Sequence, residues 1–136
     1  MAAEVAVVEY ERRRVGRELA SRVSHVGLVN AAAGYDIESV TVVGGSSVVP
    51  RFIEVKAVPP SSYRFYWTAN EVRIARALGS WYYLYLLPAD AGGHFRLDHL
   101  RIVCDPSVAV LGCATQWSIE ENVLCCELKG DSTEHA

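Results

Sequence analysis

The stretch GYDIESVTVVGGSSVVPRFIEVKAV, residues 34–58, decides the fold of this chain. Two runs rich in Val and Ile flank a Gly-Gly-Ser-Ser segment, which predicts two antiparallel strands, Ile37–Val43 and Val48–Val58, joined by a tight turn. Depending on whether the turn takes two, three or four residues, Asp36 comes opposite residue 53, 54 or 55. The hairpin therefore brings Asp36 close to the end of the second strand.

Glu54 and Lys56 share one face of that second strand, because side chains alternate between the two faces. Two carboxylates and an ammonium group then converge, and carboxylates held close together repel one another unless a cation or a proton lies between them. Mg²⁺, which prefers oxygen ligands and keeps several waters, is the usual occupant of such a site. The alternative is that these charges belong to a solvent-facing strand surface and serve only solubility. The spacing alone leaves both interpretations open.

Length and composition favour one packed domain. A chain of 136 residues with 51% hydrophobic residues can bury a core without staples, and we expect a single domain over residues 1–129 with a polar tail over 130–136. No apolar run approaches the ~18 residues that span a bilayer, and the N-terminus has no signal-peptide pattern. We therefore expect a soluble intracellular protein, cytoplasmic or nuclear, with no membrane partner.

Charge is distributed unevenly along the chain. The net charge of −3 argues against a protein that coats nucleic acid by electrostatics alone. Residues 1–80 hold ten Lys or Arg against eight Asp or Glu, whereas residues 81–136 hold three against eight. Any contact with a polyanion should therefore involve the first part of the chain, although charged runs are usually just solvated surface.

The four cysteines do not form a zinc-binding pattern. Cys104, Cys113, Cys125 and Cys126 contain no C-x-x-C pair and have no histidine at zinc-finger spacing. We expect buried free thiols, which also suit a reducing compartment.

The N-terminal segment, Ala2 to Ser21, shows helical periodicity. Apolar residues including Val8 and Val15 recur on one face, and Glu11 falls at the border of this face, so that its carboxylate could point into the protein or reach solvent. We regard Glu11 as a candidate site residue. His25 has no paired nucleophile in the pattern and is expected to be structural or on the surface.

Further elements follow the hairpin. Aromatic residues at Tyr66 and Trp67 suit a short strand, in which they could stack on a base or, as we favour, pack in the core. Thr68 and Glu71 form a capping box that starts a helix ending at Gly79. The remaining expected elements are a short strand or irregular segment at 22–30, a loop at 31–34, strands at 63–67, 81–87 and 95–104, and a strand or helix at 118–128.

Four blocks in this order, GYDIES (34–39), RFIEVK (51–56), FYWTANEV (65–72) and WYYLY (81–85), resemble the NO VEIN C-terminal domain family, within the PD-(D/E)xK or restriction-endonuclease-like nucleases. The resemblance covers roughly residues 5–90. It implies an α+β fold (α/β in the broad sense), with a central mixed sheet of about 4–5 strands flanked by helices. The wider superfamily favours Pro before the Asp, whereas Tyr35 stands here, as tyrosine does in the closer family.

The resemblance also implies site residues and a cofactor. Asp36, Glu54 and the backbone carbonyl of Val55 would bind Mg²⁺ or Mn²⁺, Lys56 would be the catalytic lysine, and Glu11 would match a helix-borne acid near the metal. For Glu71 we favour the capping role over a ligand role. The implied activity is metal-dependent hydrolysis of phosphodiester bonds in nucleic acid, DNA in the first place, with antiviral restriction or repair as its setting.

Other functions stay open at this stage. A nuclease-fold module that no longer cuts and instead binds nucleic acid or protein would suit the acidic second half of the chain. Partners could include a homodimer, formed for example through the segment with Cys113, Trp117 and Cys125, or a larger helicase or ATPase-type protein. The retained Asp36, Glu54 and Lys56 favour cleavage.

Overall fold

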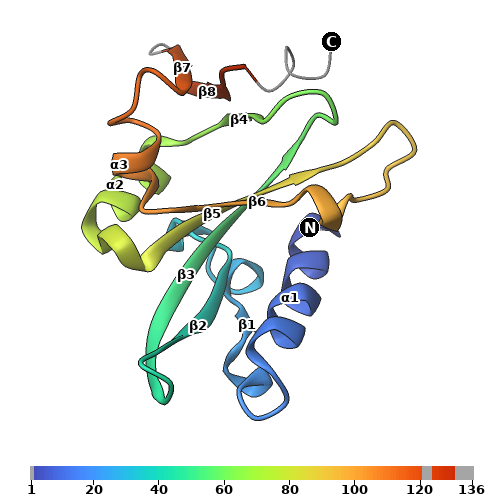
Figure 1. Cartoon of the computed structure of the whole chain (residues 1–136), viewed down its shortest axis with the longest axis vertical. Coiled ribbons are helices and arrows are strands. Elements are labelled where there is room, and N and C mark those ends of the chain that lie inside the picture. The colour runs from blue at the N-terminus through green and yellow to red at the C-terminus, as the bar shows by residue number, and fades with distance from the viewer. Residues whose placement is uncertain (1, 121–123, 131–136) are drawn as a thin grey trace.

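The computed structural model describes residues 2–120 and 124–130 (Figure 1). Three α-helices and eight strands are assigned within these residues. The helices are α1 (Ala2–Val15), α2 (Ala69–Leu78) and α3 (Pro106–Ala109); the strands are β1 (Ser24–His25), β2 (Ile37–Val43), β3 (Ser47–Val58), β4 (Arg64–Tyr66), β5 (Tyr82–Pro88), β6 (Arg101–Cys104), β7 (Trp117–Glu120) and β8 (Cys125–Leu128). Short 3₁₀ turns connect them, among them η2 (Val26–Leu28), η3 (Ala31–Ala33), η4 (Gly79–Trp81) and η5 (Leu97–His99).

The main sheet is mixed, as expected from the sequence. Its strand order is β1-β2-β3-β5-β6, with β3 and β5 parallel and the other neighbours antiparallel. The parallel pair is joined by a crossover that includes α2, the connection that parallel neighbours require. A second sheet, in the order β4-β8-β7, joins the middle of the chain to its C-terminal part. The fold is therefore of the α+β class with a five-stranded mixed sheet.

The register of the hairpin fixes the position of Asp36. Val43 pairs with Ser47 and Ile37 pairs with Ile53, so the turn contains three residues, 44–46. Gly44 and Gly45 both have positive φ, of 60° and 87°, which explains the glycines in this turn. Counted back from the Ile37 pair, Asp36 falls opposite Glu54.

The sheet is covered on both faces. On one face α1 packs over a core that includes Val7, Ile37, Ile53 and Val55. On the other face, α2 and the C-terminal segment pack over a core that includes Trp67, Leu84 and Trp117. Figure 1 shows α1 and α2 on opposite sides of the sheet. Because neighbours on a strand alternate, Glu54 and Lys56 project to the face that α2 covers.

Several sequence-based boundaries need correction. The first helix ends at Val15 rather than Ser21, because Gly16 adopts φ +90° and terminates it. The expected strand over residues 95–104 is split into the 3₁₀ turn η5 and the short strand β6. The ambiguous segment 118–128 supplies strands β7 and β8, apart from residues 121–123, which lie outside the described residues. Most of the expected tail, 131–136, also lies outside them.

The aromatic and cysteine predictions are confirmed only in part. Trp67 is 2% exposed and packs in the core, as favoured, whereas Tyr66 is 57% exposed. Cys125 and Cys126 are buried free thiols, but Cys104 is exposed, because its short strand β6 lies at the edge of the sheet. None of the helices in the described part of the chain is both long and apolar enough to cross a membrane.

Candidate active site

Asp36 is held at the end of the hairpin by the backbone of β3. Its N–H donates to the carbonyl of Ile53 at 2.8 Å, and its Oδ2 accepts the N–H of Val55, also at 2.8 Å. The preceding Gly34 has φ +82°, and a Cβ there would lie 2.6 Å from Ile74 Cγ1. The glycine of the Gly-Tyr-Asp motif is therefore required both by its backbone conformation and by the close approach of α2.

Glu54 and Lys56 lie on the same face of β3, as the alternation predicts, and their side chains interact. Lys56 Nζ is 3.2 Å from Glu54 Oε2 and 2.8 Å from Glu71 Oε1. Glu71 Oε1 also accepts the N–H of Thr68 at 3.1 Å, and Thr68 Oγ1 accepts the N–H of Glu71. The predicted capping box is confirmed, and one carboxylate both starts α2 and holds the lysine.

Asp36, Glu54 and Glu71 line a cavity of about 240 Å³. Its acidic lining residues come from four elements or connections: Glu4 from the first turn of α1, Asp36 from the start of the hairpin, Glu54 from β3 and Glu71 from the first turn of α2. The rest of the lining is Gly27, Ala31, Gly34 and Tyr35. The structure thus brings Asp36 and Glu54 into a single pocket.

Burial and like charge disturb the titration of the pocket carboxyls. Burial, and then the neighbouring charges of Asp36 and Glu71, raise the pKa of Glu54 to about 9 despite the opposing effect of Lys56. The pKa of Asp36 is also raised, chiefly by burial and also by the charge of Glu4, although the Val55 N–H and a hydrogen bond with Glu54 act against this. Burial by itself would lower the pKa of Lys56, but Glu54 and Glu71 leave it above its usual value. The pocket therefore favours a bound proton or cation between its carboxyls.

Glu11 is not brought to this pocket. Glu11 belongs to α1 and is buried between this helix and the sheet. It is 0% exposed and accepts hydrogen bonds from Arg14, Ser39 and Tyr85 at 2.7–2.8 Å. Burial would raise its pKa, but these donors and the charge of Arg14 lower it. Arg51 donates to the same Tyr85 hydroxyl at 2.7 Å. The proposed site role of Glu11 is therefore not supported by its surroundings, which are those of a satisfied structural carboxylate.

The helix-borne acid of the pocket is Glu4, which the sequence reasoning missed. A Cβ added at Gly27 would lie 3.2 Å from Glu4 Oε1 and 3.2 Å from Asp36 Oδ1. Glu4 also contacts Nε2 of His25. His25, which we expected to be structural or on the surface, therefore contacts a residue of the pocket. A sequence signal existed: Glu4 precedes Glu11 by seven residues and hence shares its helix face, two turns away.

The pocket offers carboxyl oxygens, the type of donor that hard divalent cations prefer. Carboxyl oxygens of Asp36 and Glu4 both approach Gly27, and Glu54 lines the same pocket; Mg²⁺ binds proteins through one or two carboxylates while it keeps several waters. Within residues 2–120 and 124–130, no group of three or more His, Cys, Asp or Glu side chains is arranged so that it could hold a metal ion. In the described geometry Lys56 pairs with Glu54, and Val55 contacts Asp36 through its N–H; a ligand role for the Val55 carbonyl stays a prediction.

Comparison with known protein families shows to which family this chain belongs. The sequence pattern of the family described as Protein NO VEIN, C-terminal, matches residues 3–97. The chain belongs to this family. No curated protein and no solved structure matches the chain. All residues of the pocket lie within the matched NO VEIN C-terminal region, whereas β6, α3, β7 and β8 lie beyond it.

Proposed function

We propose that this NO VEIN C-terminal domain is a metal-dependent nuclease that hydrolyses phosphodiester bonds, with DNA as the expected substrate and a restriction-endonuclease-like core as its scaffold. One observation carries the proposal: Asp36 and Glu54 line a single 240 Å³ cavity together with two further carboxyls, and Lys56 pairs with Glu54 beside it. Burying negative charge of this kind costs free energy unless a bound cation compensates it.

The roles follow from the contacts of each side chain. Asp36 is fixed by the Val55 N–H through Oδ2, so Oδ1 remains directed toward the pocket. Asp36 and Glu54, with Glu4, would hold the cation. When bound, Mg²⁺ or Mn²⁺ supplies charge neutralisation of the phosphate and a source of hydroxide at neutral pH.

Lys56 would act on the phosphate and the attacking water. Glu54 and Glu71 hold its ammonium group at the pocket, and its raised pKa keeps it charged. A charged donor fixed in advance stabilises negative charge that develops on phosphate oxygens without reorganising during the reaction. Glu71, which is itself anchored by the capping box, positions this lysine.

The setting of this activity is part of the same proposal. The four free thiols support a reducing compartment, cytoplasm or nucleus. The expected pathway is antiviral restriction or repair. This sequence shows no motif that reads a nucleic-acid sequence, so a homodimer or a helicase or ATPase-type partner would supply the specificity.

The test is cleavage by the purified chain of supercoiled, linear and single-stranded DNA and of RNA, with Mg²⁺, Mn²⁺ or EDTA. We expect metal-dependent cleavage that falls at least 100-fold in Glu54→Gln and in Lys56→Ala. Lys129→Ala is the matched control. Lys129 is the other lysine of the chain, and its side chain donates to the carbonyl of Ala114, which does not line the pocket. Equal cleavage by all variants would indicate a contaminating nuclease.

A second candidate, an inactive module that binds nucleic acid or protein, is favoured by one specific contact. Lys56 already forms ion pairs with two of the pocket carboxylates, so the cluster can be neutralised internally. Thermal unfolding in Mg²⁺ and in EDTA separates the two functions, because a cation that binds only the folded state raises the melting temperature. A rise in wild type that is absent in Asp36→Asn supports the nuclease; no rise together with no cleavage supports the module.

A further inference from the structure

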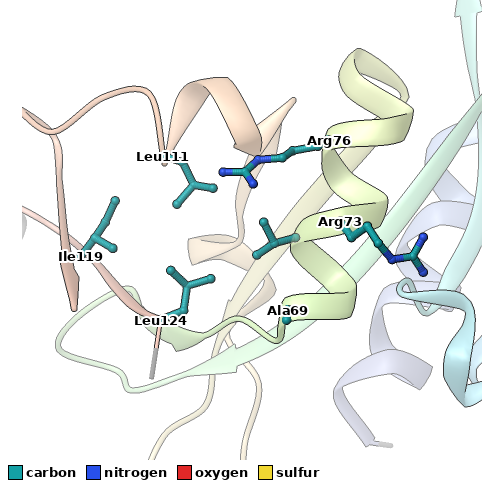
Figure 2. A pocket seen from close by; sticks show the side chains of 7 residues that line it. Ala69, Arg73, Arg76, Leu111, Ile119 and Leu124 are labelled. Carbon is teal, nitrogen blue, oxygen red and sulfur yellow. The ribbon is translucent and has the colours of Figure 1, made fainter. Parts of the chain in front are cut away.

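A second cavity, of about 650 Å³, lies on the other side of α2 (Figure 2). It is lined by Ala69, Val72, Arg73, Arg76, Leu111, Ile119 and Leu124. The α2 residues among these follow the spacing i, i+3, i+4, i+7 and so share one helix face. Glu71 lies on the opposite face of the helix, toward the active-site pocket. The larger cavity is therefore separate from the proposed nuclease site.

The walls of this cavity are apolar. Leu111, Ile119 and Leu124 face α2 across the hollow in Figure 2, and all three are only partly buried. They lie beyond residue 97, where the family match ends, so this cavity depends on the C-terminal part of the chain. Its volume falls in the range of about 300–1,000 Å³ that holds small-molecule ligands, whose sites are mostly apolar with a few placed polar groups.

Arg76 supplies such a polar group. Figure 2 shows its guanidinium reaching over the cavity toward Leu111, whereas Arg73 points away from it. Arg73 also donates to Asn70 Oδ1 at 2.7 Å. Across residues 2–120 and 124–130, no hydrogen bond or ion pair engages the Arg76 side chain. An arginine above apolar walls is complementary to a ligand with an apolar body and an anionic head.

We propose that this cavity binds a small amphipathic anion, an aliphatic carboxylate whose chain occupies the apolar hollow and whose head pairs with Arg76. The apolar body contributes by leaving water, and the charged head gives the site its selectivity. The ligand would contact α2. The first turn of this helix carries Glu71, which pairs with Lys56. The proposal does not depend on the nuclease function.

The test is titration of the full chain with octanoate and with its uncharged counterpart, 1-octanol, followed by amide chemical shifts. We expect saturable octanoate binding, with a dissociation constant on the order of 1 mM or lower, and shifts in α2 and β7. We expect octanol to bind at least about tenfold more weakly, and Arg76→Gln to remove this difference. Arg73→Gln is the matched control and should leave it intact.

A cavity-filling variant keeps the test decisive. Ala69 lines the cavity and is exposed, so Ala69→Phe should keep the fold while it weakens octanoate and octanol alike by about tenfold or more. Equal affinities for octanoate and octanol in wild type, or unchanged binding in Arg76→Gln and Ala69→Phe, would overturn the proposal. So would association of the chain with itself or with anionic vesicles through this face without binding of monomeric octanoate.

Discussion

Glu11 and Glu54 are both buried glutamates, at 0% and 5% exposure, on opposite faces of the same sheet, and their surroundings differ in kind. Glu11 is surrounded by donors, namely Arg14, Ser39 and Tyr85, and its pKa is lowered although burial acts against this. Glu54 lies among other carboxyls at a cavity, with one ammonium group shared between it and Glu71, and burial raises its pKa to about 9.

The difference separates a structural acid from a candidate site acid. A buried carboxylate whose oxygens are all satisfied by the protein has no capacity left for a ligand. A buried carboxylate that repels its neighbours beside an open cavity stays destabilised until a cation or proton arrives. Both residues are glutamates and both are buried, so their partners distinguish them.

The largest expected effect on stability is at Glu11. The isosteric change Glu11→Gln should lower the free energy of unfolding by about 3 kcal/mol, because an amide cannot accept bonds from the Arg14 guanidinium, Ser39 and Tyr85 together. Chemical denaturation at pH 7 measures this, with exposed Glu18→Gln as the control. A loss below about 1 kcal/mol would contradict the structural role.

The same substitution at Glu54 should have the opposite sign. Without metal, at pH 8, Glu54→Gln should raise the free energy of unfolding by about 2 kcal/mol. The folded protein holds a proton on Glu54 that the unfolded chain has lost, and glutamine removes the cost of taking up this proton on folding. Denaturation in EDTA measures the gain. If Glu54→Gln destabilised the protein as Glu11→Gln does, the proposed contrast between the two glutamates would be wrong.

Stability should also depend on pH in opposite ways at the two sites. The folded protein keeps a proton on Glu54 up to pH 9 or so, whereas the unfolded chain loses it near the ordinary value of 4.5, so this group makes stability fall as pH rises through that window. The lowered pKa of Glu11 gives stability that is present above its ordinary value and lost as pH falls. In EDTA, the alkaline slope should reach about 1.4 kcal/mol per pH unit.

The variants isolate this slope from other titrating groups. The difference between wild type and Glu54→Gln should grow from pH 6 to pH 9, and the difference between wild type and Glu11→Gln should stay constant there. Parallel curves for wild type and Glu54→Gln across this range would show that the carboxyl is already ionised at neutral pH.

The smallest expected effect concerns the capping box that connects α2 to the candidate active site. Thr68→Ala should lower the free energy of unfolding by about 1 kcal/mol through loss of the bond to the Glu71 N–H. Because Glu71 also binds Lys56, cleavage activity should fall as well, whereas exposed Ser80→Ala should change neither. Loss of stability with full cleavage activity would show that the cap does not position the lysine.

The sequence predicted most of what is local. Alternation on β3 placed Glu54 and Lys56 on one face, the glycine-rich turn limited the register of Asp36 to three choices, and the Thr68 and Glu71 pattern gave the helix start. Gly16 also indicated the end of α1, but the apolar periodicity continues beyond it, so the predicted helix was too long. Beyond residue 97, short strands with weak alternation left the assignment open.

What the sequence by itself determined is a mixed α+β chain of the NO VEIN C-terminal family, with Asp36, Glu54 and Lys56 on one hairpin. Only the tertiary structure decided which helix acid enters the pocket, because Glu4 and Glu11 share a helix face and periodicity cannot choose between turns. It also decided that Glu71 shares the lysine with Glu54 and that a second cavity lies behind α2. The physical reason is that spacing fixes which residues share a face, whereas charge and desolvation depend on the elements packed against that face.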